Sequence, residues 1–541
     1  MKKTIAFLLA LFMILGLFAG CKGGENTDES ESGGEAQKTL TVGIPQSSTI
    51  ESYTRGNGFT EYLEEKTGIK IKFYYFSNSP GEYRQQLALM CSANQKLPDV
   101  IVGLNLGHYV MNQYGEDGYF LDLTDLIEEY APNYKKALAE LKEKAPDVAE
   151  YASEKVKNAE NGATYGMPRI MPIATDSLQS LMHINKTWLD KLGLEPPKTV
   201  EELRTVLQAF KDNDCNGNGA HDEIALFGTS GTAAYIINAF VYYQSGCFNV
   251  TDGEVWDPVE TKEFRDALIY INDLVKDGLF DSKSFTITGS QEIKNLISPV
   301  DGPSKVGMFC GLSTIRTNAN SDAISEFSVL PALEDATGKG GYLVIEEQQV
   351  DWTGYITKDC KDPELAMQFI DAFYDDETVS RQRHGVEGED WVYYENGHNG
   401  SGTRSYVKQI NSEAFFSGRS TWGANMLGIC TDLNYLTVAE EPETDRIRET
   451  QRLVKETWDI IHNAREAEER AVHLTYTPEE YALREEKWGT YLSYLTQTVT
   501  EFMSGQKDPQ DDAQWQEFMD TLDKLGHDEL LETVKNAYAR K

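Results

Sequence analysis

The sequence predicts an α/β protein of two lobes with a helical C-terminal region. Short apolar runs alternate with helical stretches between residues 39 and 103, an order typical of a mostly parallel sheet covered by helices. The 541 residues exceed what one hydrophobic core usually serves, which predicts at least two lobes. From Thr444 onward the pattern is mainly helical and shows no repeat at solenoid spacing.

The first strands and helices follow one another at short intervals. Apolar or alternating runs predict strands over 39–45, 69–76 and 98–103. Helical patterns fill the intervals, over 59–66 and 81–94. We expect these strands to run parallel in one sheet, because each helix carries the chain back to the edge where the previous strand began.

Three later helices begin at recognisable caps. Thr199 stands three residues before Glu202, the spacing of a capping box. Asp362-Pro363 and Thr477-Pro478 each place a capping side chain directly before a first-turn proline. After the last of these, apolar residues recur every three or four positions, which predicts packing against a core rather than against a partner. This stripe consists of Trp488, Leu492, Leu495, Val499 and Phe502.

Composition and motifs narrow the function. The net charge is −37, from 50 basic and 87 acidic residues, which argues against nucleic acid or an anionic membrane surface as a partner. No nucleophile elbow, His-Glu-x-x-His pair or phosphate loop is present. A pair of glycosidase carboxylates stays possible among so many acids. The cysteines after residue 21 form no CxxC pair, so we expect most of them to be small buried residues rather than zinc ligands.

The first residues have the pattern of an export signal. Lys2 and Lys3 precede an apolar run over 4–18, and Ala19-Gly20 supplies the small residues of a cleavage site. The next residue, Cys21, resembles the lipobox cysteine of bacterial lipoproteins, which implies lipidation and attachment to the extracytoplasmic face of the cell membrane. The Gly-, Ser- and acid-rich stretch that follows predicts a flexible tether. An ordinary secretory signal with a coincidental cysteine is the alternative.

A series of motifs resembles the extracellular solute-binding proteins of the carbohydrate-transporter type. The resemblance implies a periplasmic-binding-protein-like fold of type II, with three chain crossings between the lobes. Lobe one would hold 39–165 plus 332–380 and lobe two 166–331 plus 381–541, after a signal peptide over 1–20 and a lipidated tether over 21–38. The motifs are Thr67–Lys70, Leu97–Ile101, Tyr165–Pro168, Phe327–Pro331, and Asp351–Ile356 followed by Asp362–Ala366.

Within this class the chain resembles the large, calcium-containing branch that includes alginate-oligosaccharide-binding proteins. The finer match lies in Trp188–Leu194, Pro197–Thr199, the loop 214–223 and His384–Glu389. The resemblance implies a monomeric receptor that captures a sugar or oligosaccharide and delivers it to the transmembrane subunits of an ABC permease, without enzymatic activity. A peptide receptor of an ABC importer and a surface-anchored glycosidase or lyase are the alternatives.

Candidate sugar contacts follow from the chemistry of the ligand. Sugars present flat CH faces and hydroxyl edges, so their sites combine aromatic rings with planar hydrogen-bonding groups. Trp352 begins a predicted strand in lobe one, and Trp422 lies in a loop-like stretch, although core packing is the alternative for either ring. Asn105 follows a predicted strand, at the edge where ligands bind open α/β sheets. Further candidates are Arg316 and Gln46, then Tyr242, Tyr243 and Trp256, with Arg316 or Arg169 favoured if the ligand carries uronate groups.

The loop from Asp214 to Glu223 predicts a structural Ca²⁺ site. Side-chain oxygens recur at alternate positions and a glycine follows, an arrangement that can wrap a hard cation from one side. Starting at Asp212, the loop also fits a twelve-residue EF-hand pattern, and a metal-free turn is the alternative. The register that starts at Asp214 resembles the shortened loop of the alginate-binding relatives. Its ligands would be Asp214, Asn216, Asn218, the Ala220 carbonyl, Asp222 and Glu223.

Overall fold

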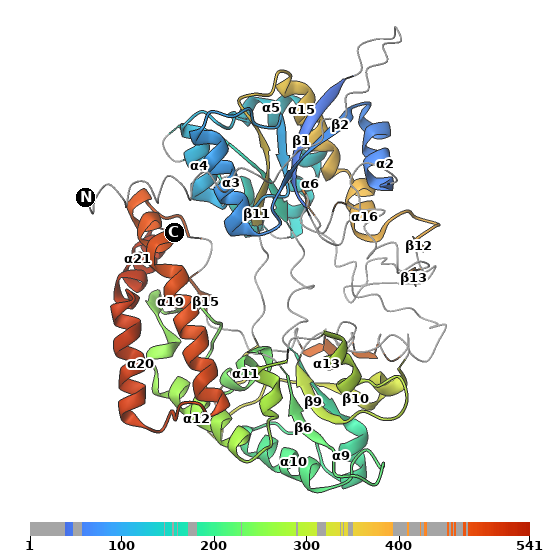
Figure 1. Cartoon of the computed structure of the whole chain (residues 1–541), viewed down its shortest axis with the longest axis vertical. Coiled ribbons are helices and arrows are strands. Elements are labelled where there is room, and N and C mark those ends of the chain that lie inside the picture. The colour runs from blue at the N-terminus through green and yellow to red at the C-terminus, as the bar shows by residue number, and fades with distance from the viewer. Residues whose placement is uncertain are drawn as a thin grey trace, which may run out of the picture. The chain divides into compact units, whose positions relative to one another are not determined.

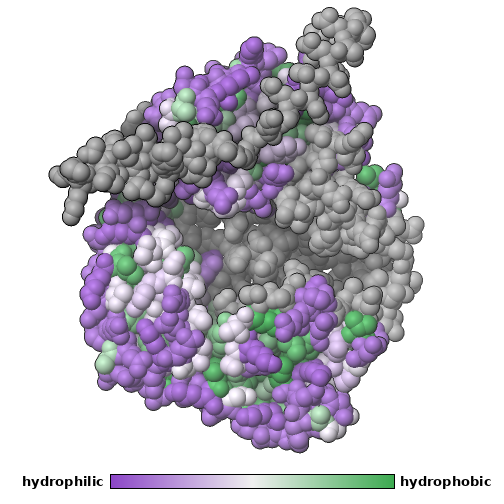
Figure 2. Space-filling model, viewed as in Figure 1, coloured by the Kyte–Doolittle hydropathy of each residue, from purple (hydrophilic) through white to green (hydrophobic). Residues whose placement is uncertain are grey.

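The computed structural model describes most of residues 38–392, scattered residues between 408 and 471, and 474–540. The larger gaps within the first range are 47–56, 171–180, 311–320 and 344–349. Residues 39–541 form one compact unit. None of the helices among the described residues is long and apolar enough to cross a membrane. On the face shown in Figure 2 the described residues are mostly hydrophilic, in keeping with the acidic composition, apart from an apolar area in the lower half.

A six-stranded sheet, which includes β1, β2 and β11 of Figure 1, forms the centre of the first lobe. The order of its strands is β14-β4-β11-β3-β1-β2. β1 runs parallel to β2 and β3, whereas β11 runs antiparallel to both of its neighbours. The strands are β1 (Thr39–Pro45), β2 (Lys70–Phe76), β3 (Val100–Val102), β4 (Met167–Ile170), β11 (Val350–Ile356) and β14 (Gly428–Ile429).

The helices of the first lobe are α2 (Gly58–Thr67), α3 (Pro80–Ser92), α4 (His108–Glu116), α5 (Thr124–Tyr130), α6 (Pro132–Lys144), α7 (Pro146–Ser153), α15 (Pro363–Asp371) and α16 (Asp376–His384). The first three strands and the two helices between them are confirmed, each within two residues of its predicted ends. Helix α2 ends as its sequence predicts, because Gly68 takes a left-handed conformation with φ 70°.

A four-stranded sheet forms the centre of the second lobe, in the order β10-β5-β9-β6. Its strands are β5 (Met182–Asn185), β6 (Ile224–Phe227), β9 (Val306–Cys310) and β10 (Phe327–Leu330). Its helices are α9 (Lys186–Leu192), α10 (Val200–Asp212), α11 (Ser230–Ile237), α12 (Lys262–Lys276) and α13 (Ser290–Ile297). The predicted N-cap of α10 is confirmed, since Thr199 Oγ1 accepts a hydrogen bond from the Glu202 N–H at 3.2 Å.

The C-terminal region is helical, as predicted, and packs into the core of the second lobe. Helix α19 begins with a complete capping box between Thr477 and Glu480. Its stripe residues Leu495, Val499 and Phe502 lie in the same hydrophobic cluster as the second sheet, which confirms the core role of the stripe. The region comprises α19 (Pro478–Ser504), α20 (Asp512–Lys524) and α21 (His527–Ala539), with a small sheet of β7 (Asn249–Thr251), β8 (Glu254–Trp256) and β15 (Glu469–Arg470).

Trp422 corrects two expectations from the sequence. Its side chain is 1% exposed and packs edge-on to Phe59 and Phe73 in the core of the first lobe. The indole Nε1–H donates to Thr60 Oγ1 at 2.7 Å, so the polar edge of the ring is satisfied within the protein. Trp422 is therefore a core residue and not a sugar contact. It also lies in lobe one, although the expected boundary placed everything after residue 380 in lobe two.

Strand β14 explains the difference. Gly428 and Ile429 pair with Arg169 and Ile170 of β4, so this segment becomes the outermost strand of the first sheet.

The tyrosine candidates Tyr242 and Tyr243 are also buried, at 2% and 5% exposure. The expectation that most cysteines are buried is confirmed for four of them: Cys91, Cys215, Cys310 and Cys360.

Replacing Trp422 tests its core role. We expect Trp422→Ala to lower the free energy of unfolding by about 3–5 kcal/mol, because the substitution removes a buried aromatic side chain and leaves a cavity. Urea unfolding followed by tryptophan fluorescence or circular dichroism would measure the change. Trp256→Ala, at a half-buried ring, is the control and should cost less. Unchanged stability of Trp422→Ala would contradict the assignment.

Candidate ligand-binding site and metal loop

Three polar side chains meet at one edge of the first sheet. Asn105 follows β3, Arg169 lies near the end of β4, and Asp351 opposes Arg169 in the register of β11. Because β11 is antiparallel to β3 and β4, its first residues lie beside the last residues of those strands. Asn105 Nδ2 donates to Asp351 Oδ1 at 2.7 Å, and Arg169 Nη1 donates to Asp351 Oδ2 at 3.0 Å. We call Asn105, Arg169 and Asp351 the edge triad.

Burial and pairing set the electrostatics of the edge triad. The Arg169 and Asp351 side chains are 11% and 22% exposed. Burial is the largest influence on Asp351 and raises the pKa of its carboxyl group, while Arg169 and the hydrogen bonds oppose that shift. The guanidinium charge of Arg169, a candidate for binding uronate groups, is thus already paired with a carboxylate of this protein.

Trp352 adjoins the edge triad but is largely covered. Its side chain is 4% exposed and its ring lies 5.4 Å from His108 and 5.5 Å from Tyr151, between ring centroids. The ring is therefore part of a packed aromatic cluster and does not present an open face for stacking. Its Nε1 atom is buried and has no hydrogen-bond partner within the described part of the chain. A buried donor of this kind is costly unless a partner reaches it.

Further groups surround the loop that carries Asn105. Tyr83 Oη donates to the Asn105 carbonyl at 2.8 Å, and Arg84 Nη2 donates to the same oxygen at 3.3 Å. Among the described residues, Arg84 Nε and Asn112 Oδ1 are also buried without a hydrogen-bond partner. Near the loop, two donors (Arg84 Nε and Trp352 Nε1) and one acceptor (Asn112 Oδ1) therefore have no hydrogen-bond partner among the described residues, and aromatic rings lie beside them.

The other sequence candidates have mixed outcomes. Gln46 follows β1, which is parallel to β3, so it lies at the same edge of the sheet and is exposed. Arg316 falls outside the described residues. The sequence interpretation missed His108 and Tyr151 as neighbours of Trp352, and it gave Asp351 no role. Asp351 had a signal, since it directly precedes Trp352, whereas Tyr151 is distant in sequence and had none.

The loop 214–223 closes through its own polar groups. Asn216 Nδ2 and Asn218 Nδ2 both donate to Asp222 Oδ1 at 2.9 Å. The Gly219 N–H donates to Asp214 Oδ2 at 3.0 Å, and the Asn216 N–H donates to Glu223 Oε1 at 3.2 Å. All the side chains of the predicted calcium ligands therefore lie in one hydrogen-bonded loop.

Two carboxylate oxygens of this loop accept no hydrogen bond from the described residues. Asp214 Oδ1 and Glu223 Oε2 are buried and have no hydrogen-bond partner in the described chain. Buried anionic oxygens without donors favour a cation. A competing cation is present, because Lys305 Nζ donates to Asp222 Oδ2 at 2.6 Å and its hydrogen bond is the main cause that lowers the pKa of Asp222 to about 2. Asp214 Oδ1 and Glu223 Oε2 are therefore the oxygens of this loop that are available to a cation, whereas Asp222 is paired with Lys305.

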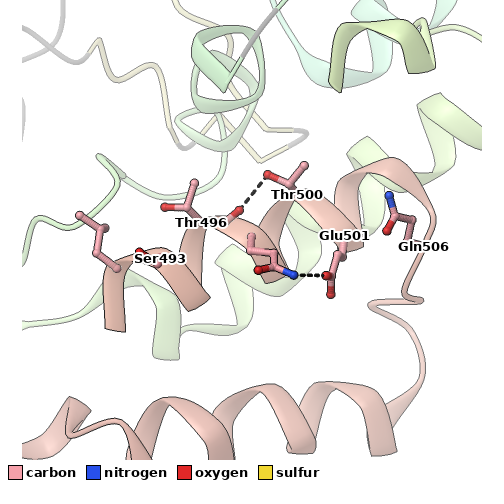
Figure 3. A pocket seen from close by; sticks show the side chains of 7 residues that line it. Ser493, Thr496, Thr500, Glu501 and Gln506 are labelled. Atoms are coloured by element: carbon pink, nitrogen blue, oxygen red, sulfur yellow. Dashed lines mark hydrogen bonds between the residues drawn. The ribbon is translucent and has the colours of Figure 1, made fainter. Parts of the chain in front are cut away.

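A hollow on the side of α19 has the wrong chemistry for a ligand site (Figure 3). Gln497 Nε2 donates to Glu501 Oε1 at 2.9 Å, and Thr500 Oγ1 donates to the Thr496 carbonyl at 2.8 Å. Gln497, Thr500 and Glu501 thus form hydrogen bonds along the helix itself. The edge triad remains the better candidate.

Comparisons with known proteins agree with this architecture. Residues 47–292 match the family model described as bacterial extracellular solute-binding protein. The fructooligosaccharide ABC transporter substrate-binding protein FusA of Streptococcus pneumoniae is 28% identical over 345 residues, which span 61% of this chain and 59% of FusA, less than two thirds of that relative. Lipoprotein LipO of Bacillus subtilis is 24% identical over 410 residues, 72% of this chain and 73% of LipO.

Solved structures share the fold. FusA of S. pneumoniae in complex with kestose has a TM-score of 0.71 at 22% identity, over 93% of this chain and 99% of that chain. The alginate-binding protein AlgQ2 without calcium ion has a TM-score of 0.64 at 20% identity, over 94% of this chain and 99% of that chain. At these identities the likeness concerns the fold, and it confirms the two-lobed α/β class with a helical C-terminal region. Together with the family match over 47–292, it makes this chain similar to the bacterial extracellular solute-binding proteins in sequence and in fold.

Proposed function

We propose that this protein captures a sugar or oligosaccharide outside the cell and delivers it to the transmembrane subunits of an ABC permease. The observation that carries the proposal is the edge triad of Asn105, Arg169 and Asp351, placed where ligands bind open α/β sheets. An amide, a guanidinium and a carboxylate offer the planar donors and acceptors that hydroxyl groups require. The solute named for FusA, a fructooligosaccharide, supports this ligand class.

The proposal is for binding without catalysis. The relatives reported above with a named activity are binding proteins. Within the described hydrogen-bonded group, Asp351 is the one carboxylate, and it is held by Arg169 and Asn105. Glycoside hydrolysis usually needs two carboxyl groups placed about 5–10 Å apart across the scissile bond. Hinged closure of two lobes around a ligand, by contrast, needs no bond-making group.

Membrane attachment and a structural metal complete the proposal. We infer that Cys21 carries the lipid anchor, that the protein acts as a monomer on the extracytoplasmic face, and that Ca²⁺ binds the loop 214–223. LipO, named a lipoprotein, supports the anchor. The two buried oxygens of Asp214 and Glu223 support the metal. Filling the loop would offset the repulsion among three carboxylates and hold the loop together.

Titration calorimetry against glycans and peptides tests the ligand class. The glycan panel should contain neutral oligosaccharides and uronate oligomers, and the peptide panel should cover acidic, basic and apolar sequences. We expect stoichiometric binding of at least one glycan, with no new products on chromatography. Binding of peptides alone would support a peptide receptor, and glycan turnover would support a surface enzyme.

Trp352→Phe tests whether the unmet indole donor serves the ligand. We expect glycan affinity to fall about two- to tenfold, because one hydrogen bond is worth about 0.5–1.5 kcal/mol. Thermal stability should change little, since Nε1 has no partner in the described chain. The matched control is Trp391→Phe, because Trp391 Nε1 already donates to the Gly385 carbonyl at 3.0 Å. That control should lose stability and keep affinity, and the opposite pattern would contradict the role of Trp352.

Chelation tests the metal loop and its register. Removal of Ca²⁺ should lower the melting temperature, since binding at a hundredfold excess over Kd contributes about 2.7 kcal/mol. Asp214→Asn with Glu223→Gln should abolish the response to chelator. Asp212→Asn should preserve it, because Asp212 Oδ2 accepts from Gln208 Nε2 at 2.8 Å and lies outside the preferred register. Loss of the response in Asp212→Asn would instead favour the twelve-residue EF-hand register.

A further inference from the structure

At the start of α21, the buried imidazole of His527 contacts the buried carboxylate of Asp257. The His527 side chain is 1% exposed, and its Nε2 atom lies 3.2 Å from Oδ2 of Asp257. Tyr491 Oη donates to the same oxygen at 3.2 Å, and the other oxygen of Asp257 accepts the Val259 N–H at 2.9 Å. Asp257 is thus fixed by its own partners, and it fixes the orientation of the ring.

The opposite nitrogen of the ring faces three more carboxylates. His527 Nδ1 lies 3.3 Å from Asp528 Oδ1, 3.9 Å from Glu260 Oε1 and 4.0 Å from Asp523 Oδ1. The ligand atoms of Asp523, His527 and Asp528 all lie within 4.8 Å of one another. In a tetrahedral site with metal–ligand bonds of about 2.1 Å, neighbouring ligand atoms are roughly 3.4 Å apart. The ligand atoms of Asp523, His527 and Asp528 are spaced more widely than such a shell, and Glu260, which lies outside this group of three, faces the same ring nitrogen.

We propose that His527, Asp523, Asp528 and Glu260 form a second metal site, for a divalent transition-metal ion such as Zn²⁺. His527 would bind through Nδ1 and the three carboxylates through one oxygen each. Asp257 is a positioning residue, because it accepts the Nε2–H and so leaves the Nδ1 lone pair directed at the ion. The nitrogen donor separates this site from the all-oxygen loop 214–223, since imidazole favours Zn²⁺ and its neighbours over Ca²⁺.

The arrangement of charge also favours a cation at this point. Four carboxylates surround one imidazole, so even a protonated ring would leave the group strongly negative. Despite burial, the hydrogen bond and charge of Asp257 raise the pKa of His527 to about 9. Lys535 acts weakly on Glu260, and the first-turn N–H groups of α21 add positive potential. A proton on Nδ1, directed at Asp528 Oδ1 3.3 Å away, is the rival occupant of this position.

The ligands come from separate elements, which gives the ion a structural role. Asp523 lies in the last turn of α20, His527 and Asp528 begin α21, and Glu260 belongs to the 3₁₀ turn η2 (Pro258–Glu260). The side chains of Asp523, Asp528 and Glu260 are 57%, 85% and 47% exposed, so an ion could enter from solvent without unfolding. Bound metal would join the turn between the two helices to the second lobe.

Titration with Zn²⁺ and Co²⁺ tests the site on the purified whole protein, with excess Ca²⁺ present to occupy the other loop. We expect one Zn²⁺ per chain, a higher melting temperature, and visible Co²⁺ absorption typical of four nitrogen and oxygen ligands. Asp523→Asn with Asp528→Asn should weaken Zn²⁺ binding at least tenfold. Asp520→Asn with Glu532→Gln is the matched control, because both residues are exposed on the same two helices. This control should bind like the parent protein.

Three results would overturn the proposal. They are no Zn²⁺ binding up to 1 mM, on the order of the weakest useful affinity; equal binding by the double variant and the parent; and equal losses in the double variant and the control. Any of these would leave His527 as a protonated imidazolium that pairs with the carboxylates. Glu260→Gln provides an independent variant from another element, should the double variant fail to fold, and it should also weaken Zn²⁺ binding.

Discussion

Insertion of β11 between β3 and β4 is the interaction on which the candidate site depends. The strand arrives from residue 350, long after its neighbours, and hydrogen-bonds to both of them in antiparallel register. That pairing brings Asp351 opposite Arg169 and within reach of Asn105. A slip of one residue would turn Asp351 to the other face of the sheet and remove the edge triad. The ladder therefore fixes the polar group more firmly than the side chains could fix one another.

The negative charges of the many acidic side chains are compensated differently in three parts of the structure. On the edge of the first sheet, a carboxylate is paired with a guanidinium and an amide. In the loop 214–223, carboxylates share one lysine and several N–H groups, and two oxygens have no donor among the residues that the structure describes. At the start of α21, acids gather around an imidazole. The overall charge of −37 makes such local compensation necessary, since like charges would otherwise repel in the folded state.

Local patterns predicted the regular elements well. The caps at Thr199 and Thr477 are satisfied as expected, and the apolar stripe of α19 lies in a core. These features depend on residues within a few positions of one another. Trp422 was misassigned because a two-residue strand that joins a distant edge carries no local signal. The covering of Trp352 by His108 and Tyr151, and the gathering of acids around His527, likewise depend on elements that are far apart in sequence.

The pairing of β14 with β4 has a consequence for the order in which the protein folds. Gly428 pairs with Arg169 at the outer side of the first sheet. The sheet is therefore complete only after a segment about 260 residues further along the chain has joined β4. Contacts between such distant residues form slowly, because a long loop must close first. A chain that emerges from its N-terminus therefore exposes an unfinished first lobe while the second lobe is being made. Until then β4 lacks its outer neighbour, and its unpaired backbone groups can pair with another chain or be cleaved by proteases. Synthesis of residues 428 and 429 supplies the missing strand.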